Sequence, residues 1–203
     1  YANIYNEVDG LVGVITDITD RKKAEEQVKR LALYDELTNL PNRRLFFERL
    51  SHALSRGKRS GTYVGVLYLD LNGFKQINDT HGHETGDEDL RIIGKRIGST
   101  LRKMDTAARL GGDEFGIILS DLNDTDGITT VAVKLVKTIN QPILIENIRM
   151  SVRAAVGISI YPTHGTEIDD LINKADQAMY NAKARSKTDI NQSVAYYSKQ
   201  KEQ

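Results

Sequence analysis

The chain has 203 residues, and its 28 Lys and Arg balance 28 Asp and Glu, so the formal net charge is zero. That balance excludes the basic excess typical of proteins that bind nucleic-acid polymers, and the 39% hydrophobic content excludes a disordered chain. Because there is no cysteine, disulfides, thiolate nucleophiles and thiolate metal ligands are also excluded. No run approaches the roughly 20 apolar residues of a membrane helix, so we expect a cytoplasmic chain without membrane contact of its own.

The first 34 residues predict two attachments to a larger domain. Asp9 and Gly10 form a turn signal before the apolar run 11–15, so residues 1–19 are expected to be the end of a β structure. Residues 20–34 are highly charged, with Ala24, Val28 and Leu31 at helical spacing. This pattern fits a solvated linker helix or a short coiled coil that joins two copies, and it leaves both open. The missing initiator Met suggests a piece of a longer protein.

From residue 35 onwards the pattern is that of one globular domain. We expect a helix over 43–56, a central strand over 63–69 that ends at Asp70, a hairpin with strands 106–110 and 115–119, and strands over 143–145 and 148–160. The inner faces of three helices are expected at Leu90, Ile93, Ile97, Leu101 and Met104, at Ile128, Val131, Leu135 and Ile139, and at Ile168, Leu171, Ile172, Ala175 and Met179. Helices alternating with strands and hairpins predict an α/β fold, an α+β sandwich with a mixed or mostly antiparallel sheet.

Three acidic residues stand where a core-building sequence would not place them. Asp70 ends an apolar strand, and Asp113 and Glu114 fill the turn of the hairpin. If the strands are neighbours, these carboxylates converge at one end of the sheet, where they either shift their pKa values or bind a cation. Oxygen ligands without Cys favour Mg²⁺ or Mn²⁺. The alternative is that Asp70 caps a helix and the turn is merely solvated.

Residues suited to a nucleotide surround these carboxylates. Gly111 and Gly112 allow close approach of a ligand to the backbone, and basic residues follow at Lys75, Lys183, Arg185 and Lys187. Asn78 and Asp87 could supply the donor and acceptor pair that a guanine edge requires, or they could serve as ordinary turn and cap residues. The common nucleotide-binding motifs G-x-x-x-x-G-K-[ST] and G-x-G-x-x-G are absent.

Five motifs in order resemble the GGDEF family of bacterial diguanylate cyclases. Residues 109–115, Arg-Leu-Gly-Gly-Asp-Glu-Phe, resemble the signature loop, and residues 35–43 resemble the opening segment. Residues 70–79 and 82–87 are similar to the metal and guanine segments, and 175–183 to the closing helix. Residues 10–25 look like the last strand of a PAS sensor domain that continues into a signalling helix. The resemblance implies a sensor remnant at 1–19, a linker helix at 20–34, the GGDEF domain at 35–190 and a tail at 191–203.

The resemblance also implies a palm-like fold related to adenylyl cyclases and an activity, the condensation of two GTP into cyclic di-GMP. Asp70, the Leu71 carbonyl and Asp113 would hold Mg²⁺, and Glu114 would join the metals or assist deprotonation. The implied phosphate contacts are Phe74, Lys75, Lys183 and Lys187, with the triphosphate against Gly111 and Gly112, and Asn78 and Asp87 would bind guanine. Arg102 and Asp105 resemble the family's R-x-x-D site for inhibition by the product.

The implied reaction requires a homodimer, because each domain would hold one GTP. The sequence departs from the commonest family pattern at Asn72, which replaces the second Asp of D-x-D, at Asn39, which replaces a Gly, and at Arg185-Ser186. None of these residues is assigned to metal or guanine contact. A non-catalytic module that binds GTP or cyclic di-GMP and regulates an attached domain is the alternative function.

Overall fold

The structure is a computed structural model that describes residues 17–145, 148–185 and 193–198. The expected sensor strand at 11–15 and most of the expected tail at 191–203 lie outside the described residues. The chain divides into two compact units, residues 1–32 and 33–203.

The first unit contains helix α1, Thr19–Leu33. It begins where the carboxylate of Asp17 accepts a hydrogen bond from the backbone N–H of Thr19 at 2.8 Å. No residue of α1 is buried, and its apolar side chains Val28 and Leu31 are 66% and 51% exposed. The expected helix is therefore present, and its apolar stripe is not covered by any part of the chain that the structure describes.

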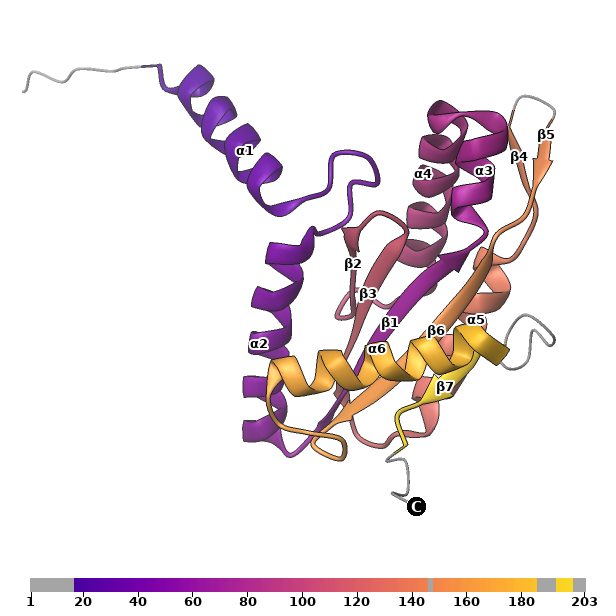
Figure 1. The fold of residues 1–203 in the computed structure, drawn as a ribbon. Coiled ribbons are helices and arrows are strands. Elements are labelled where there is room, and N and C mark those ends of the chain that lie inside the picture. The colour runs from indigo at the N-terminus through magenta and orange to yellow at the C-terminus, as the bar shows by residue number, and fades with distance from the viewer. Residues whose placement is uncertain (1–16, 146–147, 186–192, 199–203) are drawn as a thin grey trace, which may run out of the picture. The chain divides into compact units, whose positions relative to one another are not determined.

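The second unit is built on a five-stranded sheet with the order β2-β3-β1-β6-β7 (Figure 1). Its strands are β1, Tyr63–Asn72; β2, Thr106–Gly111; β3, Glu114–Leu122; β6, Arg153–Tyr161; and β7, Val194–Tyr196. All neighbours are antiparallel except β6 and β7. The short strands β4, Ile143–Ile145, and β5, Ile148–Met150, form a separate hairpin. The predicted class, α/β with a mostly antiparallel sheet, is confirmed.

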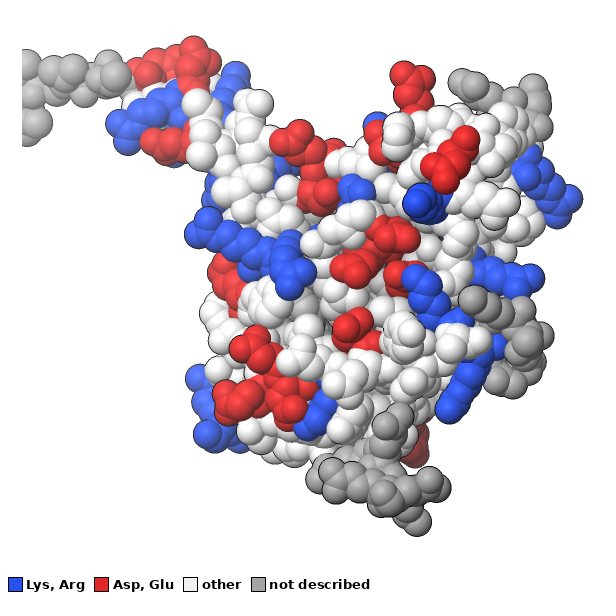
Figure 2. All heavy atoms as spheres, in the orientation of Figure 1, with Lys and Arg blue, Asp and Glu red and all other residues white. Residues whose placement is uncertain are grey.

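Helices cover both faces of this sheet (Figure 1). One face carries α2, Arg43–Ser60, and α6, Ile168–Arg185; the other carries α3, Phe74–His81, α4, His83–Thr100, and α5, Asp126–Ile139. Among the described helices, none is long and apolar enough to cross a membrane. Acidic and basic side chains form adjacent patches across the face that carries α6 (Figure 2).

Strand alternation decides which side chains reach each face. Along β1, Leu67, Leu69 and Leu71 belong to the core under α4 and α5, whereas Val66 and Tyr68 belong to the core under α2 and α6. Successive side chains of a strand point to opposite faces. The side chain at position 70 therefore faces α6, and this places an acidic group on the face to which α6 contributes its basic C-terminal turn.

The structure corrects three details of the predicted elements. Strand β1 does not end at Asp70 but continues to Asn72, because its pairing with β6 extends through Leu71–Ala154 and Asn72–Arg153. The expected strand 148–160 is two strands, β5 and β6. Met104 lies beyond the end of α4 and is 50% exposed, rather than on the helix's inner stripe.

Candidate active site

Two of the three predicted carboxylates are cross-strand neighbours. Asp70 on β1 is paired in register with Glu114, the first residue of β3, and Asp113 precedes it in the hairpin turn. Alternation places the side chain at 114 on the same face as Asp70, because Phe115 and Ile117 point into the core under α4 and α5. The hairpin therefore brings the signature acids to the end of the central strand, as the sequence predicts.

The turn that presents these acids depends on glycine. Gly111 and Gly112 have φ of 155° and 50°, a region that side-chain-bearing residues rarely adopt. Arg109 stabilises the turn through two contacts. Its Nε donates to the Gly112 carbonyl at 2.9 Å, and its Nη1 forms an ion pair with Asp35 at 3.2 Å. An added Cβ at either glycine would meet no atom within 4 Å, so the space above the turn is open.

A lysine of α6 lies against the carboxylates. Lys183 Nζ is 2.7 Å from Asp70 Oδ1, and the Asp70 residue is only 7% exposed. The pKa of Asp113 is raised, first by burial and then by the negative charge of Asp70, while its own backbone N–H, Lys183 and Arg109 act in the opposite direction. Two carboxylates thus repel each other in a partly buried place that Lys183 only partly neutralises.

Tyr68 orients the third acid. Its hydroxyl donates to Glu114 Oε2 at 2.9 Å, and it lies two residues before Asp70 on the same face of β1. Burial, followed by the hydrogen bond and the charge of Glu114, raises the pKa of Tyr68 well above its ordinary value, so the phenol keeps its proton. One carboxylate oxygen of Glu114 is therefore fixed by Tyr68.

These residues suit a hard divalent cation. The described residues contain no ready-formed group of three His, Cys, Asp or Glu side chains that could hold an ion. The repulsion between Asp70 and Asp113 is nevertheless the situation that a bound cation relieves, and carboxylate and carbonyl oxygens are the ligands that Mg²⁺ prefers. Asp70, the Leu71 carbonyl, Asp113 and Glu114 would hold it.

A pocket of about 490 Å³ opens beside the carboxylates. It is lined by Leu71, Asn72, Gly73, Phe74, Lys75, Asp113, Arg153 and Lys183. The structure thus brings together the predicted phosphate contacts Phe74, Lys75 and Lys183 with two predicted metal ligands, Leu71 and Asp113. Gly111 and Gly112 lie in the neighbouring turn rather than in the lining. Lys187 falls outside the described residues.

The two predicted guanine residues lie on a pair of packed helices. Asn78 is on α3 and Asp87 on α4, and the Oδ1 atom of Asn78 rests on the backbone of Gly86, where an added Cβ would lie 1.8 Å away. That Oδ1 atom is buried and has no hydrogen-bond partner among the described residues, whereas Asp87 is exposed. The geometry holds Asn78 against the residue that precedes Asp87, which suits a two-point contact with a base edge.

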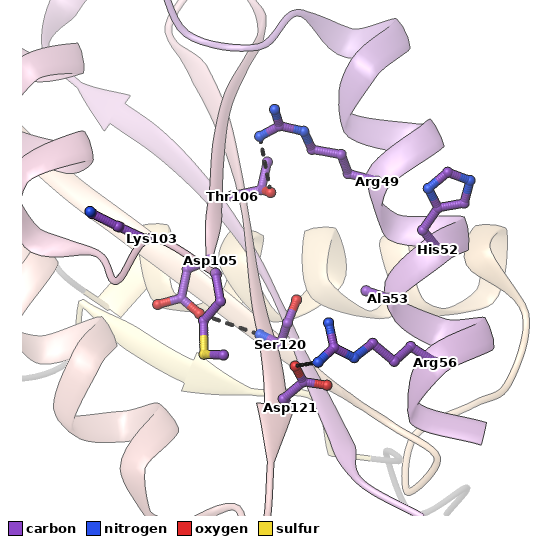
Figure 3. Close-up of a pocket in the computed structure, with 10 residues that line it drawn as sticks. Arg49, His52, Ala53, Arg56, Lys103, Asp105, Thr106, Ser120 and Asp121 are labelled. Carbon is purple, nitrogen blue, oxygen red and sulfur yellow. Dashed lines mark hydrogen bonds and ion pairs between the residues drawn. The ribbon is translucent and has the colours of Figure 1, made fainter. Parts of the chain in front are cut away.

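A second pocket, of about 330 Å³, lies between α2 and the start of β2 (Figure 3). Lys103, Met104, Asp105 and Thr106 contribute to one side of it, together with Ser120 and Asp121. Three basic side chains of α2, namely Arg49, His52 and Arg56, contribute to the other. Arg56 is paired with Asp121 at 2.9 Å, and Arg49 Nη1 donates to the Thr106 hydroxyl at 3.4 Å.

Only one of the two predicted product-site residues, Arg102 and Asp105, lines this second pocket. Asp105 lines this pocket, whereas Arg102 does not. Both carboxylate oxygens of Asp105 accept backbone N–H bonds, Oδ2 from Arg102 at 3.0 Å and Oδ1 from Ser120 at 3.3 Å. Asp105 therefore also stabilises the turn after α4, while the Arg102 residue is exposed.

Residues 32–189 match the model of the family described as diguanylate cyclase, GGDEF domain. The chain belongs to the GGDEF family. The bifunctional diguanylate cyclase/cyclic di-GMP phosphodiesterase MucR of Pseudomonas aeruginosa is 42% identical over 165 residues, 81% of this chain and 24% of MucR. The chain spans 20 to 36% of the length of the curated relatives compared with it.

Solved structures show the same GGDEF fold. The GGDEF domain of PA1120 (TpbB or YfiN) from P. aeruginosa is 35% identical, with a TM-score of 0.76 over 81% of this chain and 94% of that one. The coiled coil and GGDEF domain of DgcB from Caulobacter crescentus, in complex with c-di-GMP, is 26% identical with a TM-score of 0.76 and covers 88% of this chain and 93% of that one.

Several candidate residues of this GGDEF domain were missed by sequence reasoning. Tyr68 and Arg153 lie inside apolar strand patterns, where a polar residue is easily taken as part of the strand. Period-two alternation from Asp70 would have flagged Tyr68. Arg49 and Arg56 lie on a helix far from β2 in sequence, and no local signal connects them with Asp105.

Proposed function

We propose that this GGDEF domain is an active diguanylate cyclase, which condenses two GTP into cyclic di-GMP and releases two pyrophosphates. The observation that supports this most directly is the pairing of Asp70 with Glu114 next to a pocket lined by Asp113, Lys75 and Lys183. Acids beside a pocket that two lysines line suit a nucleoside triphosphate and its divalent cation.

We assign the roles as follows. Asp70, the Leu71 carbonyl, Asp113 and Glu114 would hold Mg²⁺ or Mn²⁺, which neutralises the polyphosphate and makes the attacking hydroxyl more acidic. Phe74, Lys75, Lys183 and Lys187 position the phosphates beside the turn at Gly111 and Gly112. Asn78 and Asp87 bind the guanine edge.

The reaction balances as two identical phosphodiester-forming steps. In each step the 3′-oxygen of one GTP attacks the α-phosphorus of the other, the bond to the pyrophosphate leaving group breaks, and the 3′-hydroxyl proton is lost, assisted by Glu114. One site per domain means that two domains must face each other, so we propose a homodimer. The uncovered apolar residues Val28 and Leu31 of α1 support a role for this helix in joining two copies.

We further propose the domain organisation expected from the sequence. Residues 1–19 would be the end of a PAS sensor, 20–34 a signalling helix, 35–190 the cyclase in the cytoplasm, and 191–203 a tail. This tail is not separate from the cyclase throughout, because Val194–Tyr196 add strand β7 to the central sheet beside β6. The helix α1 at Thr19–Leu33 and the separate unit that contains it support the boundary near residue 34.

The decisive experiment is a product assay with GTP and Mg²⁺. We expect the purified protein to form cyclic di-GMP and pyrophosphate, and Glu114→Gln to lose nearly all turnover. Glu167→Gln is the matched control, because Glu167 is an exposed carboxylate just before α6, at the end of the helix remote from Lys183. A dimer that binds GTP and forms no product would refute the proposal.

Feedback inhibition by the product is the second part of the proposal. The pocket of Figure 3 combines Asp105 with Arg49, His52 and Arg56, and arginine can bind phosphate or guanine through two hydrogen bonds. We expect cyclic di-GMP to inhibit the wild-type protein and Arg102→Ala to relieve that inhibition without loss of basal turnover. Inhibition that is unchanged in Arg102→Ala would remove Arg102 from the product site.

The alternative is a non-catalytic module that binds GTP or cyclic di-GMP and regulates an attached domain. The observation that favours it is the 36% identity to the cyclic di-GMP phosphodiesterase NbdA of P. aeruginosa, whose name includes no cyclase activity and of which this chain covers 20%. The intact signature acids favour the cyclase, because a module that only senses a ligand has no need of Glu114. The same product assay separates the two functions.

A further inference from the structure

Arg153 lines the pocket of about 490 Å³ beside the carboxylates, although no motif singles it out. It is the first residue of β6 and pairs in register with Asn72, one position beyond the pairs Leu71–Ala154 and Asp70–Ala155. The same pocket is lined by Lys75, Lys183 and Asp113.

Strand alternation places the Arg153 side chain on the catalytic face. Ala154, Val156 and Ile158 belong to the core under α4 and α5, whereas Ala155 belongs to the core under α2 and α6. The side chain at 153 therefore projects to the side of Ala155, which is the side of Lys183 and the Asp70 carboxylate.

The charge of Arg153 is not neutralised within the described part of the chain. Its side chain is exposed, and the structure shows no hydrogen bond or ion pair from its guanidinium to a described residue. Its cross-strand neighbour Asn72 carries no charge. By contrast, Lys183 is held by Asp70 at 2.7 Å and Arg109 by Asp35 at 3.2 Å. Arg153 is thus a cation of the pocket without a carboxylate partner among these residues.

We propose that Arg153 is a further binding residue for the polyphosphate chain of the nucleoside triphosphate. The planar guanidinium donates parallel hydrogen bonds that match two phosphate oxygens, which a lysine ammonium does not do. The wide spacing of Lys75 on α3, Lys183 on α6 and Arg153 on β6 lets three elements contact one extended anion. This proposal rests on the proposed function, because it names a substrate contact of the same site.

The test is equilibrium binding of GTP and of GMP, in the presence of Mg²⁺, to the wild-type chain and to Arg153→Gln. We expect the affinity for GTP to fall by about tenfold or more, as for one charge-assisted contact, and that for GMP to stay nearly unchanged. Arg153→Lys should restore part of the loss. Arg149→Gln is the matched control, since Arg149 is an exposed arginine of β5 that does not line the pocket.

The outcomes separate this inference from the proposed function. If the wild-type protein forms cyclic di-GMP and Arg153→Gln binds GTP normally, the cyclase stands and the role of Arg153 is refuted. If no product forms while Arg153→Gln loses GTP affinity selectively, Arg153 is a phosphate contact of a non-catalytic module. Equal losses for GTP and GMP would also refute it, because they would indicate a general distortion of the site.

Discussion

A buried acid outside the active site carries a quantitative prediction about stability. Asp89 on α4 is 0% exposed, and neither of its carboxylate oxygens has a hydrogen-bond partner among the described residues. Burial raises its pKa from 3.8 to about 6, and the charge of Arg96 offsets only part of this effect. Arg96 is otherwise engaged, because its guanidinium donates to the backbone carbonyls of Ile139, Gln141 and Pro142 at 3.0, 2.6 and 3.0 Å.

The direction in which stability changes with pH follows from the raised pKa of Asp89. The folded protein binds the Asp89 proton more tightly than the unfolded chain does, so the stability from this proton is complete below about pH 3.8 and is lost as the pH rises through about 6. The two pKa values are separated by roughly two pH units at about 1.36 kcal/mol each, so the loss approaches about 3 kcal/mol at pH 8. Asp89→Asn removes the charge and keeps the shape of the side chain.

We therefore expect Asp89→Asn to gain stability relative to the wild-type protein as the pH rises. The difference in free energy of unfolding should grow by about 2 to 3 kcal/mol between pH 4 and pH 8, which corresponds to about 5 to 10 °C in Tm for a domain of this size. Urea and thermal unfolding followed by circular dichroism measure it. Asp79→Asn, at an exposed position of α3, is the control. A difference that does not depend on pH would refute the reasoning.

Two predictions concern the active site. Tyr68→Phe removes the 2.9 Å hydrogen bond to Glu114 and should lower kcat about tenfold, with Tm nearly unchanged. Tyr63→Phe is the control. An unchanged kcat in Tyr68→Phe would show that Tyr68 does not position Glu114. Lys183→Met removes the cation 2.7 Å from Asp70 and should strengthen Mg²⁺ binding to the nucleotide-free protein while weakening GTP binding, both measured by calorimetry. Lys174→Met is the control on α6. If Lys183→Met strengthens or weakens the binding of both Mg²⁺ and GTP, the proposed role of Lys183 is wrong.

The parts of the site that local sequence determines were predictable. Glycines with positive φ define the turn before Glu114, and a hairpin next to a central strand brings Glu114 opposite Asp70, because register follows from the turn. The contacts between distant elements were not predictable. The approach of Lys183 to Asp70 depends on how α6 packs across the sheet, and nothing within either segment specifies that distance.

Met104 shows that helical spacing of apolar residues does not by itself predict burial. Its spacing continues the apolar stripe Leu90–Ile93–Ile97, but the hydrogen bond from the backbone N–H of Arg102 to Asp105 Oδ2 forms a turn after the helix and leaves Met104 exposed. A side-chain cap thus overrides a hydrophobic pattern, since it offers the backbone an alternative to the next helical turn.

Lys183 connects the electrostatics of the acidic cluster with those of the proposed reaction. Asp70 is nearly buried and its neighbour Asp113 has a raised pKa, so the carboxylates would destabilise the fold without a cation, and Lys183 supplies one at 2.7 Å. If a divalent ion binds Asp70, as we propose, the ammonium of Lys183 would be released beside the pocket that Lys75 and Arg153 line. Metal binding would then create positive charge at the proposed phosphate site. The two ligands should therefore bind with positive coupling, and each should bind more weakly when the other is withheld.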